Sequence, residues 1–211
     1  MFNTYDALVD EVKNGGGLTP LLASGWEYAD PTTLNITLKD GIKFHSGNVL
    51  DADDVVYSFN RLMNMGQGFS FLFGTVDSVS ALDSKTVQFK TKEPFAPLVA
   101  SLMRLAIVDK DDVQANTVDG NYGDNGDYGE AYLLTTSAGA GAYKITQHDP
   151  NVKTVLTKNG DYFQGHNPKA PDEVIIKYSV EAATIKTLLM RGEHEISSMW
   201  LPNEVLAALE K

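Results

Sequence analysis

Residues 33–63 read TLNITLKDGIKFHSGNVLDADDVVYSFNRLM, which joins a strand pattern to a helix pattern. Over 33–39 apolar and polar residues alternate, as expected for a strand with one buried face. Two glycine turns follow. Asp51 then stands at the N-cap of a helix through Met63, and the acids after it suit the positive end of the helix dipole. The run therefore predicts a half-buried strand, a double turn and a capped helix.

The predicted helix is amphipathic. Its apolar residues recur at helical spacing on one face, which should be buried: Val55, Val56, Phe59, Leu62 and Met63. The acidic run at 51–54 is interpreted as a helix cap and not as a metal site, because carboxylates in a first turn diverge from one another.

The same criteria predict the remaining elements. Strands are expected as a hairpin at 75–82 and 85–92, as a buried strand at 105–108, as a second hairpin at 142–147 and 152–158, at 172–180, and around 194–197. Helices are expected within 94–103 and at 109–115, 181–191 and 202–210. Because hairpins and helices are mixed along the chain, the predicted fold class is α+β or mixed α/β.

Composition excludes several classes of protein. The 211 residues include 17 Lys and Arg against 28 Asp and Glu, a formal net charge of −11. That balance argues against a nucleic-acid partner, which requires clustered basic residues. The chain has no cysteine, which excludes disulfides and a cysteine nucleophile. The apolar run at 96–108 is too short and too polar to span a bilayer. Residues 2–14 have no leader pattern, which leaves open a cytosolic protein or one whose leader has been removed.

Motifs for catalysis and metal binding are missing. A G-x-G pattern begins at Gly139, but a strand is expected after it and not a helix, so phosphate binding is not predicted. The four histidines at 45, 148, 166 and 194 lack metal-ligand spacing. The segment 118–130 fails the EF-hand spacing, although an irregular calcium site through Asp119, Asp124 and Asp127 stays an alternative to a solvated acidic loop. The sequence predicts no enzyme, no catalytic residue, no cofactor and no metal.

Four separated blocks resemble one known family. The first block consists of three stretches: LLASGWEYAD (21–30), LNITLKDGIKFHSG (34–47) and DADDVVYSFNRL (51–62). The other three blocks read GAGAYKI (139–145), LTKNGDYFQGHNPK (156–169) and TIKTLLMRGEHEI (184–196). In this order they resemble the extracellular solute-binding proteins of family 5, the peptide/nickel-binding receptors of ABC importers. That family's first motif runs roughly L-A-x-S-W-E … L-R-x-G-V-K-F-H-D-G-x-x-x-T-A-x-D-V-x-x-S. Here Lys39, Ser46 and Asp51 replace its usual Arg, Asp and Thr.

The resemblance implies a fold of the periplasmic-binding-protein type, class II. Members of the family fold into two lobes around a cleft, and this chain corresponds to most of the first lobe. Residues 1–142 are then expected to form the smaller subdomain inserted in that lobe, and residues 143–211 part of the larger one. The second lobe would be absent, as in an excised piece.

The resemblance also implies a function. The expected protein captures an oligopeptide-like solute and delivers it to an ABC permease, outside the cytoplasmic membrane, as a periplasmic protein or a surface-anchored lipoprotein, and as a monomer. An oligosaccharide or a metal chelate is the alternative solute within the family. A peptide hydrolase and an adhesion module are the alternatives from other classes, and the hydrolase lacks a nucleophile–base pair.

The positions at which the family places its ligand contacts suggest three places for a ligand in this chain. Arg104 falls where a relative that binds a metal-chelate anion has a ligand-contacting arginine, with a structural ion pair as the alternative role. Phe69 and Phe71, with Phe73, form either a core-facing strand or a cleft wall. Met199 and Trp200 follow the last predicted strand, where Trp200 could stack on a ligand.

Overall fold

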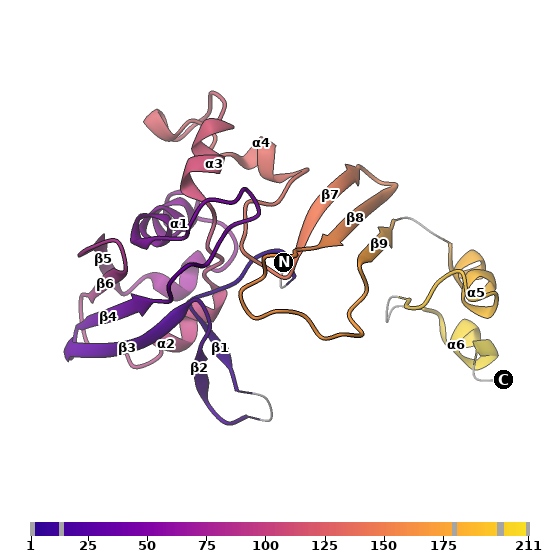
Figure 1. Cartoon of the computed structure of the whole chain (residues 1–211), viewed down its shortest axis with the longest axis horizontal. Helices are drawn as coiled ribbons and strands as arrows, with labels where there is room; N and C mark the ends of the chain where they lie inside the picture. Colours follow the sequence, from indigo (N-terminus) through magenta and orange to yellow (C-terminus); the bar gives the residue numbers. More distant parts are fainter. Residues whose placement is uncertain (1–2, 13–14, 179–180, 198–200, 210–211) are drawn as a thin grey trace.

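The computed structural model describes residues 3–12, 15–178, 181–197 and 201–209. Its strands form three separate antiparallel sheets, shown in Figure 1. The first is the small hairpin β1 (Val9–Glu11) and β2 (Leu18–Pro20). The second has the order β3-β4-β6-β5 and the third the order β7-β8-β9. Among the described residues, no helix has both the length and the apolar character needed to cross a membrane.

The four-stranded sheet carries the main core. It consists of β3 (Ala23–Asp30), β4 (Thr33–Leu38), β5 (Val76–Ala81) and β6 (Thr86–Thr91). The alternation in β4 is confirmed, because Leu34 and Ile36 are fully buried. The predicted hairpin of β5 and β6 is also confirmed, whereas β3 was not expected from the sequence.

Helix α1 (Ala52–Met65) packs against β5 and β6. Asp51 caps it as predicted, since its side chain accepts hydrogen bonds from the backbone N–H groups of Asp53 and Asp54. Val55 and Phe59 are buried, while Val56 and Leu62 are half-buried against the same core. The predicted apolar face is therefore confirmed, with three of its five residues, Val56, Leu62 and Met63, at the edge of the core.

The segment after β6 differs from the prediction in one respect. It forms α2 (Leu98–Ser101), the 3-10 helix η2 (Leu102–Arg104) and, further on, α3 (Lys110–Ala115). The predicted strand at 105–108 is wrong: these residues join no sheet, although Leu105 and Ile107 are fully buried. An apolar run here reflects burial between other elements, and burial alone does not require strand pairing.

The chain from 116 to 142 contains two short helices. These are η3 (Gly123–Asn125) and α4 (Glu130–Leu133). A small second core lies here, where the buried Tyr128 packs against Tyr57 and Tyr122. The segment 118–130 is therefore anchored by aromatic packing and is not only a solvated loop.

The last part of the chain contains the third sheet and two helices. The sheet is built from β7 (Tyr143–Asp149), β8 (Lys153–Lys158) and β9 (Glu173–Lys177). The predicted strand at 194–197 is wrong, since these residues adopt no strand. Helices α5 (Ala182–Met190) and α6 (Asn203–Leu209) contact each other and lie beyond β9, at the end of the molecule away from the four-stranded sheet (Figure 1).

Residues 139–143, called the glycine segment below, lead from the part of the chain that contains the four-stranded sheet into the three-stranded sheet. Strands β4 and β9 belong to different sheets, as the expected two subdomains require. Between them, Gly141 N–H donates to the carbonyl of Thr4 and Tyr143 N–H to that of Asn3. A Cβ on Gly141 would lie 2.6 Å from the Thr4 carbonyl carbon, so only glycine allows this approach. A subdomain boundary between residues 142 and 143 stays a prediction.

Candidate functional site

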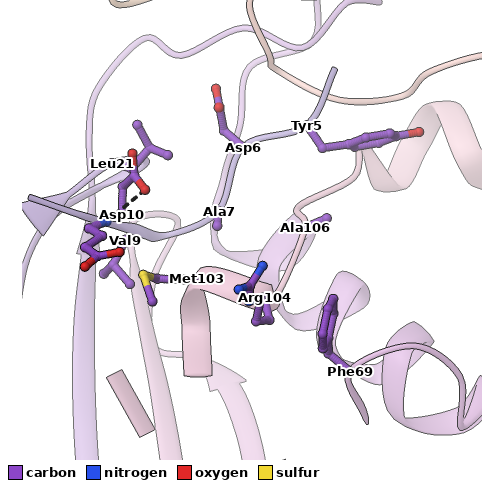
Figure 2. A pocket seen from close by; sticks show the side chains of 11 residues that line it. Tyr5, Asp6, Ala7, Val9, Asp10, Leu21, Phe69, Met103, Arg104 and Ala106 are labelled. Carbon is purple, nitrogen blue, oxygen red and sulfur yellow. Dashed lines mark hydrogen bonds between the residues drawn. The ribbon is translucent and has the colours of Figure 1, made fainter. Parts of the chain in front are cut away.

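A pocket of about 330 Å³ opens beside the N-terminal segment. Residues 5–7 and 9–11 form one side of it, and Phe69 with residues 103, 104 and 106 forms the other. Figure 2 shows the Arg104 and Phe69 side chains next to each other on one wall. Two of the residues predicted to contact a ligand thus line one pocket.

Arg104 reaches the pocket because of the helical turn before it. Pro97 precedes α2, and the apolar residues of the turn, Leu98, Leu102 and Leu105, are buried. In a 3-10 helix, residues three apart lie on the same face, so Leu102 and Leu105 share the buried face. Arg104 lies between them in the sequence on another face, and its side chain is exposed. Its guanidinium carbon lies 5.2 Å from the centroid of the Phe69 ring, a cation–π distance. The aromatic ring thereby supports an exposed, permanently charged group.

The three phenylalanines do not form a strand, so that interpretation was wrong. Residues Ser70–Phe73 form the 3-10 helix η1, preceded by Gly68 with a positive φ of 57°. Phe73 is fully buried and packs edge-to-face on Phe59, with ring centroids 5.7 Å apart. Phe69 lines the pocket, whereas Phe71 is 74% exposed and lies outside the pocket lining.

Acidic residues line the other side of the pocket. Asp10 and Glu11 are exposed there, and Asp6 is buried. Burial raises the pKa of Asp6 to about 6, despite an opposing hydrogen bond from Tyr162. Its Oδ2 atom has no hydrogen-bond partner among the described residues. Figure 2 shows Asp6 and Ala7 projecting to opposite sides of the segment, with Ala7 toward Arg104. The pocket lining therefore combines one cationic group, Arg104, with the exposed acids Asp10 and Glu11, whereas the Asp6 carboxylate points away from Arg104.

The acidic side of this pocket was missed by sequence reasoning. Residues 3–8 have neither strand nor helix periodicity, and no motif marks Asp6. Its environment depends on Tyr162, which lies in a distant part of the sequence. Met199 and Trp200, the remaining predicted site residues, lie outside the described residues.

His45 holds the glycine segment in place. Its Nε2 lies 3.0 Å from the carbonyl oxygen of Gly141, and its Nδ1 lies 3.1 Å from Oγ of Ser137. Burial lowers the pKa of His45, so the neutral ring can donate from Nε2 and accept at Nδ1. Ser137 Oγ also accepts the N–H of Ile145. The histidine acts as a structural link between residues 137 and 141.

The structure gives no support to the calcium alternative. The Asp127 carboxylate accepts hydrogen bonds from the backbone N–H groups of Val118, Gly129 and Ala131, and these bonds lower its pKa. In the part of the chain that the structure describes, no three His, Cys, Asp or Glu side chains are grouped to hold a metal ion. Asp127 instead organises the backbone around it.

Comparison with known proteins places these features in a family. The family model of the bacterial extracellular solute-binding proteins, family 5 Middle, matches residues 17–210. The chain is 30% identical over 217 aligned residues to the probable D,D-dipeptide-binding periplasmic protein DdpA of Escherichia coli. It is 24% identical to the di/tripeptide-binding protein 2 of Pseudomonas aeruginosa. These alignments cover 100% and 96% of this chain but 40% of each relative, so the chain spans less than half of their length.

Solved structures give the same result for the fold. The periplasmic binding protein DppA of Helicobacter pylori, in complex with the peptide STSA, matches 90% of this chain and 40% of that protein, with 27% identity and a TM-score of 0.70. NikZ of Campylobacter jejuni, in complex with Ni(L-His), matches 91% of this chain and 37% of that protein, with 19% identity and a TM-score of 0.75. The predicted fold of the periplasmic-binding-protein type is confirmed for this portion of such proteins.

Proposed function

This chain belongs to the bacterial extracellular solute-binding proteins of family 5, and we propose that it forms part of the solute-capturing component of an ABC importer. The solute is an oligopeptide-like molecule, and the intact protein delivers it to a membrane permease. The family is one of binding proteins, so capture requires no catalytic group.

The observation that carries this proposal is the pocket with Arg104 on one wall and acids on the other. A guanidinium recognises a carboxylate through paired hydrogen bonds, and carboxylates recognise an ammonium group. A peptide has both charged ends. The pocket of about 330 Å³ is near the lower limit of ligand sites, and the Phe69 ring supplies an apolar surface beside the arginine. These features favour a short peptide over a neutral sugar.

The remaining parts of the proposal concern the whole protein. Residues 1–142 and 143–211 are proposed as two subdomains of one lobe, and a second lobe closes over the solute and excludes water. Met199 and Trp200 are proposed to extend the same ligand wall. The intact receptor acts outside the cytoplasmic membrane, in keeping with the relative that is named a periplasmic protein.

The proposal is tested by titrating short peptides into the isotope-labelled chain and following the backbone amide signals by NMR. We expect weak binding that shifts signals of residues 5–11 and 103–106, because contacts from a second lobe are not available. Arg104→Ala and Phe69→Ala should each weaken binding about tenfold or more.

Two matched variants serve as controls. Arg191→Ala removes an exposed arginine near Glu193, and Phe71→Ala removes the exposed neighbour of Phe69 that does not line the pocket. Neither should change binding. Equal losses in Phe69→Ala and Phe71→Ala would argue against this pocket. Stronger binding of an oligosaccharide or of a nickel–histidine complex would replace the peptide as solute.

A further inference from the structure

Asp6 is a carboxylic acid enclosed behind one wall of the pocket. It is the middle residue of 5–7, called the wall segment below, and all three of these residues line the pocket. Asp6 is only 8% exposed, and its Oδ2 atom is enclosed without a hydrogen-bond partner among the described residues. The neighbouring Tyr5 hydroxyl is engaged elsewhere, since it accepts the N–H of Ala138. Because this chain already encloses Oδ2, nothing further can reach that atom while the wall segment keeps its place.

The groups that act on this carboxyl include no base. Tyr162 donates a hydrogen bond to it, and the charge of Asp10 repels its own. Burial raises the pKa of Tyr162, and the charge of Asp6 raises it further, so the phenol remains a donor. Arg104 lies on the other side of the wall segment, as Figure 2 shows. Among the described residues, an ionised Asp6 therefore has one hydrogen-bond donor and no counterion.

This enclosure favours the neutral carboxyl. Burial raises the pKa of Asp6 from 3.8 to about 6, although the bond from Tyr162 opposes the change. An acid whose pKa is raised in the folded state contributes its full stability below the unfolded pKa. That contribution is lost as the pH rises through the folded value. The wall segment is therefore held most firmly in acid, and less firmly at neutral pH.

The wall segment is also bonded to the other side of the pocket. The carbonyl of Asp6 accepts the N–H of Ile107 at 3.1 Å, and the carbonyl of Ala7 accepts the N–H of Leu22 at 3.2 Å. The residue before Ile107 lines the pocket as well. A movement that brings the Asp6 carboxylate to water breaks the bond to Ile107, so it disturbs both sides of the pocket.

We propose that Asp6 is a proton-operated latch of this pocket. With a neutral carboxyl, the wall segment stays packed against Tyr162 and the pocket is complete. Ionisation places an unpaired charge in the enclosure, and the wall segment moves outward to bring that charge to water. Solute is then captured more tightly in mild acid than at neutral pH. Only this effect on the solute rests on the proposed function, whereas the movement of the wall segment does not.

The first test measures the wall segment without any solute. Hydrogen exchange followed by NMR gives the protection factor of the Ile107 amide, corrected for the intrinsic effect of pH on exchange. We expect this factor to fall about tenfold or more from about pH 4.5 to about pH 7, because each unit by which folding raises a pKa allows a tenfold change. The titration of the Asp6 side-chain carbon signal shows whether the same carboxyl ionises in that interval.

Three variants identify the group responsible. Asp6→Asn is neutral at every pH and similar in shape to the protonated acid, so it should remove most of the fall. Tyr162→Phe removes the donor that favours the ionised form, and should extend the fall to higher pH. A Tyr162 that only fills space would leave the pH range unchanged. Asp77→Asn, at an exposed acid of β5, is the matched control and should follow the parent.

The second test adds trialanine as the solute. Both ends of this peptide stay charged between about pH 5 and about pH 7, so the peptide itself does not titrate there. Its dissociation constant for the parent should be about threefold larger at the higher pH, because a smaller fraction of the protein has a complete pocket. Asp6→Asn should remove this difference, and Asp77→Asn should keep it.

The outcomes separate the latch from the proposed function. Protection of Ile107 that is independent of pH, or that falls equally in the parent and in Asp6→Asn, would overturn the latch. An unchanged pH range in Tyr162→Phe would also overturn it, and this variant decides the matter if Asp6→Asn does not fold. Equal pH dependence of trialanine binding in the parent and in Asp6→Asn would overturn the control of capture. Exchange as predicted, without trialanine binding at any pH, would support the latch and contradict the peptide as solute.

Discussion

Asp51 and Asp54 bond reciprocally at the start of α1. Asp51 Oδ1 accepts the backbone N–H of Asp54 at 3.3 Å, and Asp54 Oδ2 accepts the N–H of Asp51 at 2.9 Å. This is a capping box in which aspartate takes the place of the more usual glutamate at its third position. It fixes the start of the helix that covers the four-stranded sheet.

Removing the cap should destabilise the protein moderately. Asp51→Ala leaves the N–H groups of Asp53 and Asp54 without their acceptor and should lower the free energy of unfolding by about 0.5–2 kcal/mol. Urea denaturation followed by circular dichroism measures this change. Asp53→Ala, on the exposed side of the same turn, is the control. An equal loss in both variants would contradict a specific capping role.

Asp54 should make stability depend on pH. Burial raises its pKa from 3.8 to about 7. A carboxyl whose pKa is raised in the folded state contributes stability below its unfolded pKa, and this contribution is lost as the pH rises toward the folded value. The unfolding free energy of Asp54→Asn, relative to the parent, should therefore increase as the pH rises from about 4 to 7. Asp54→Asn also loses one of the two carboxylate oxygens that accept backbone hydrogen bonds. This loss lowers the stability of the variant by the same amount at every pH. Parallel curves for the two proteins would contradict the prediction.

The glycine segment should not tolerate a side chain. A Cβ on Gly141 would lie 2.6 Å from the carbonyl carbon of Thr4 and 2.7 Å from the carbonyl oxygen of Asn3, both backbone atoms. Gly141→Ala should therefore cost about 1–3 kcal/mol through overpacking. Gly160→Ala is the control, since a Cβ there meets nothing within 4 Å. Thermal denaturation of both variants measures the difference, and similar melting temperatures would refute the close approach.

The phenylalanines of η1 should differ sharply in their energetic roles. Phe73 is fully buried, and Phe73→Ala should destabilise by about 3–5 kcal/mol. Phe71 is 74% exposed, and Phe71→Ala should change stability by less than about 0.5 kcal/mol. Chemical denaturation of the two variants distinguishes this arrangement from a strand, in which all three rings would share one face.

Local pattern explains which elements could be predicted. Strand β4 and helix α1 have clear periodicity and strong end signals, so both were predicted nearly to the residue. Strand β3 has no comparable alternation, since Gly25 interrupts the pattern and Tyr28 is exposed. It forms a strand because it pairs with β4, and that pairing leaves no local signal in the sequence. The phenylalanines alternate in sequence like a strand, yet a glycine before them allows a tight 3-10 turn.

The lining of the candidate pocket could be expected only in part from the sequence. Arg104 interrupts an apolar run, a contrast visible in the sequence, and the family resemblance suggested it as a ligand contact; that role stays a prediction. The acidic wall is not visible in this way, because Asp6 lies in a segment without pattern and its burial is created by residues far along the chain. No local signal could indicate such a contact.

The bonds between residues 3–4 and residues 141–143 also bear on the order of folding. Asn3 and Thr4 accept hydrogen bonds from Tyr143 and Gly141, and the carbonyl of Asp6 accepts one from the amide of Ile107. Contacts between such distant segments form slowly, because a long loop must close before they can be made. On the ribosome, the N-terminal segment emerges well before residues 138–143 exist. Residues 3–6 are therefore synthesised well before the partners that they contact, and these contacts form late.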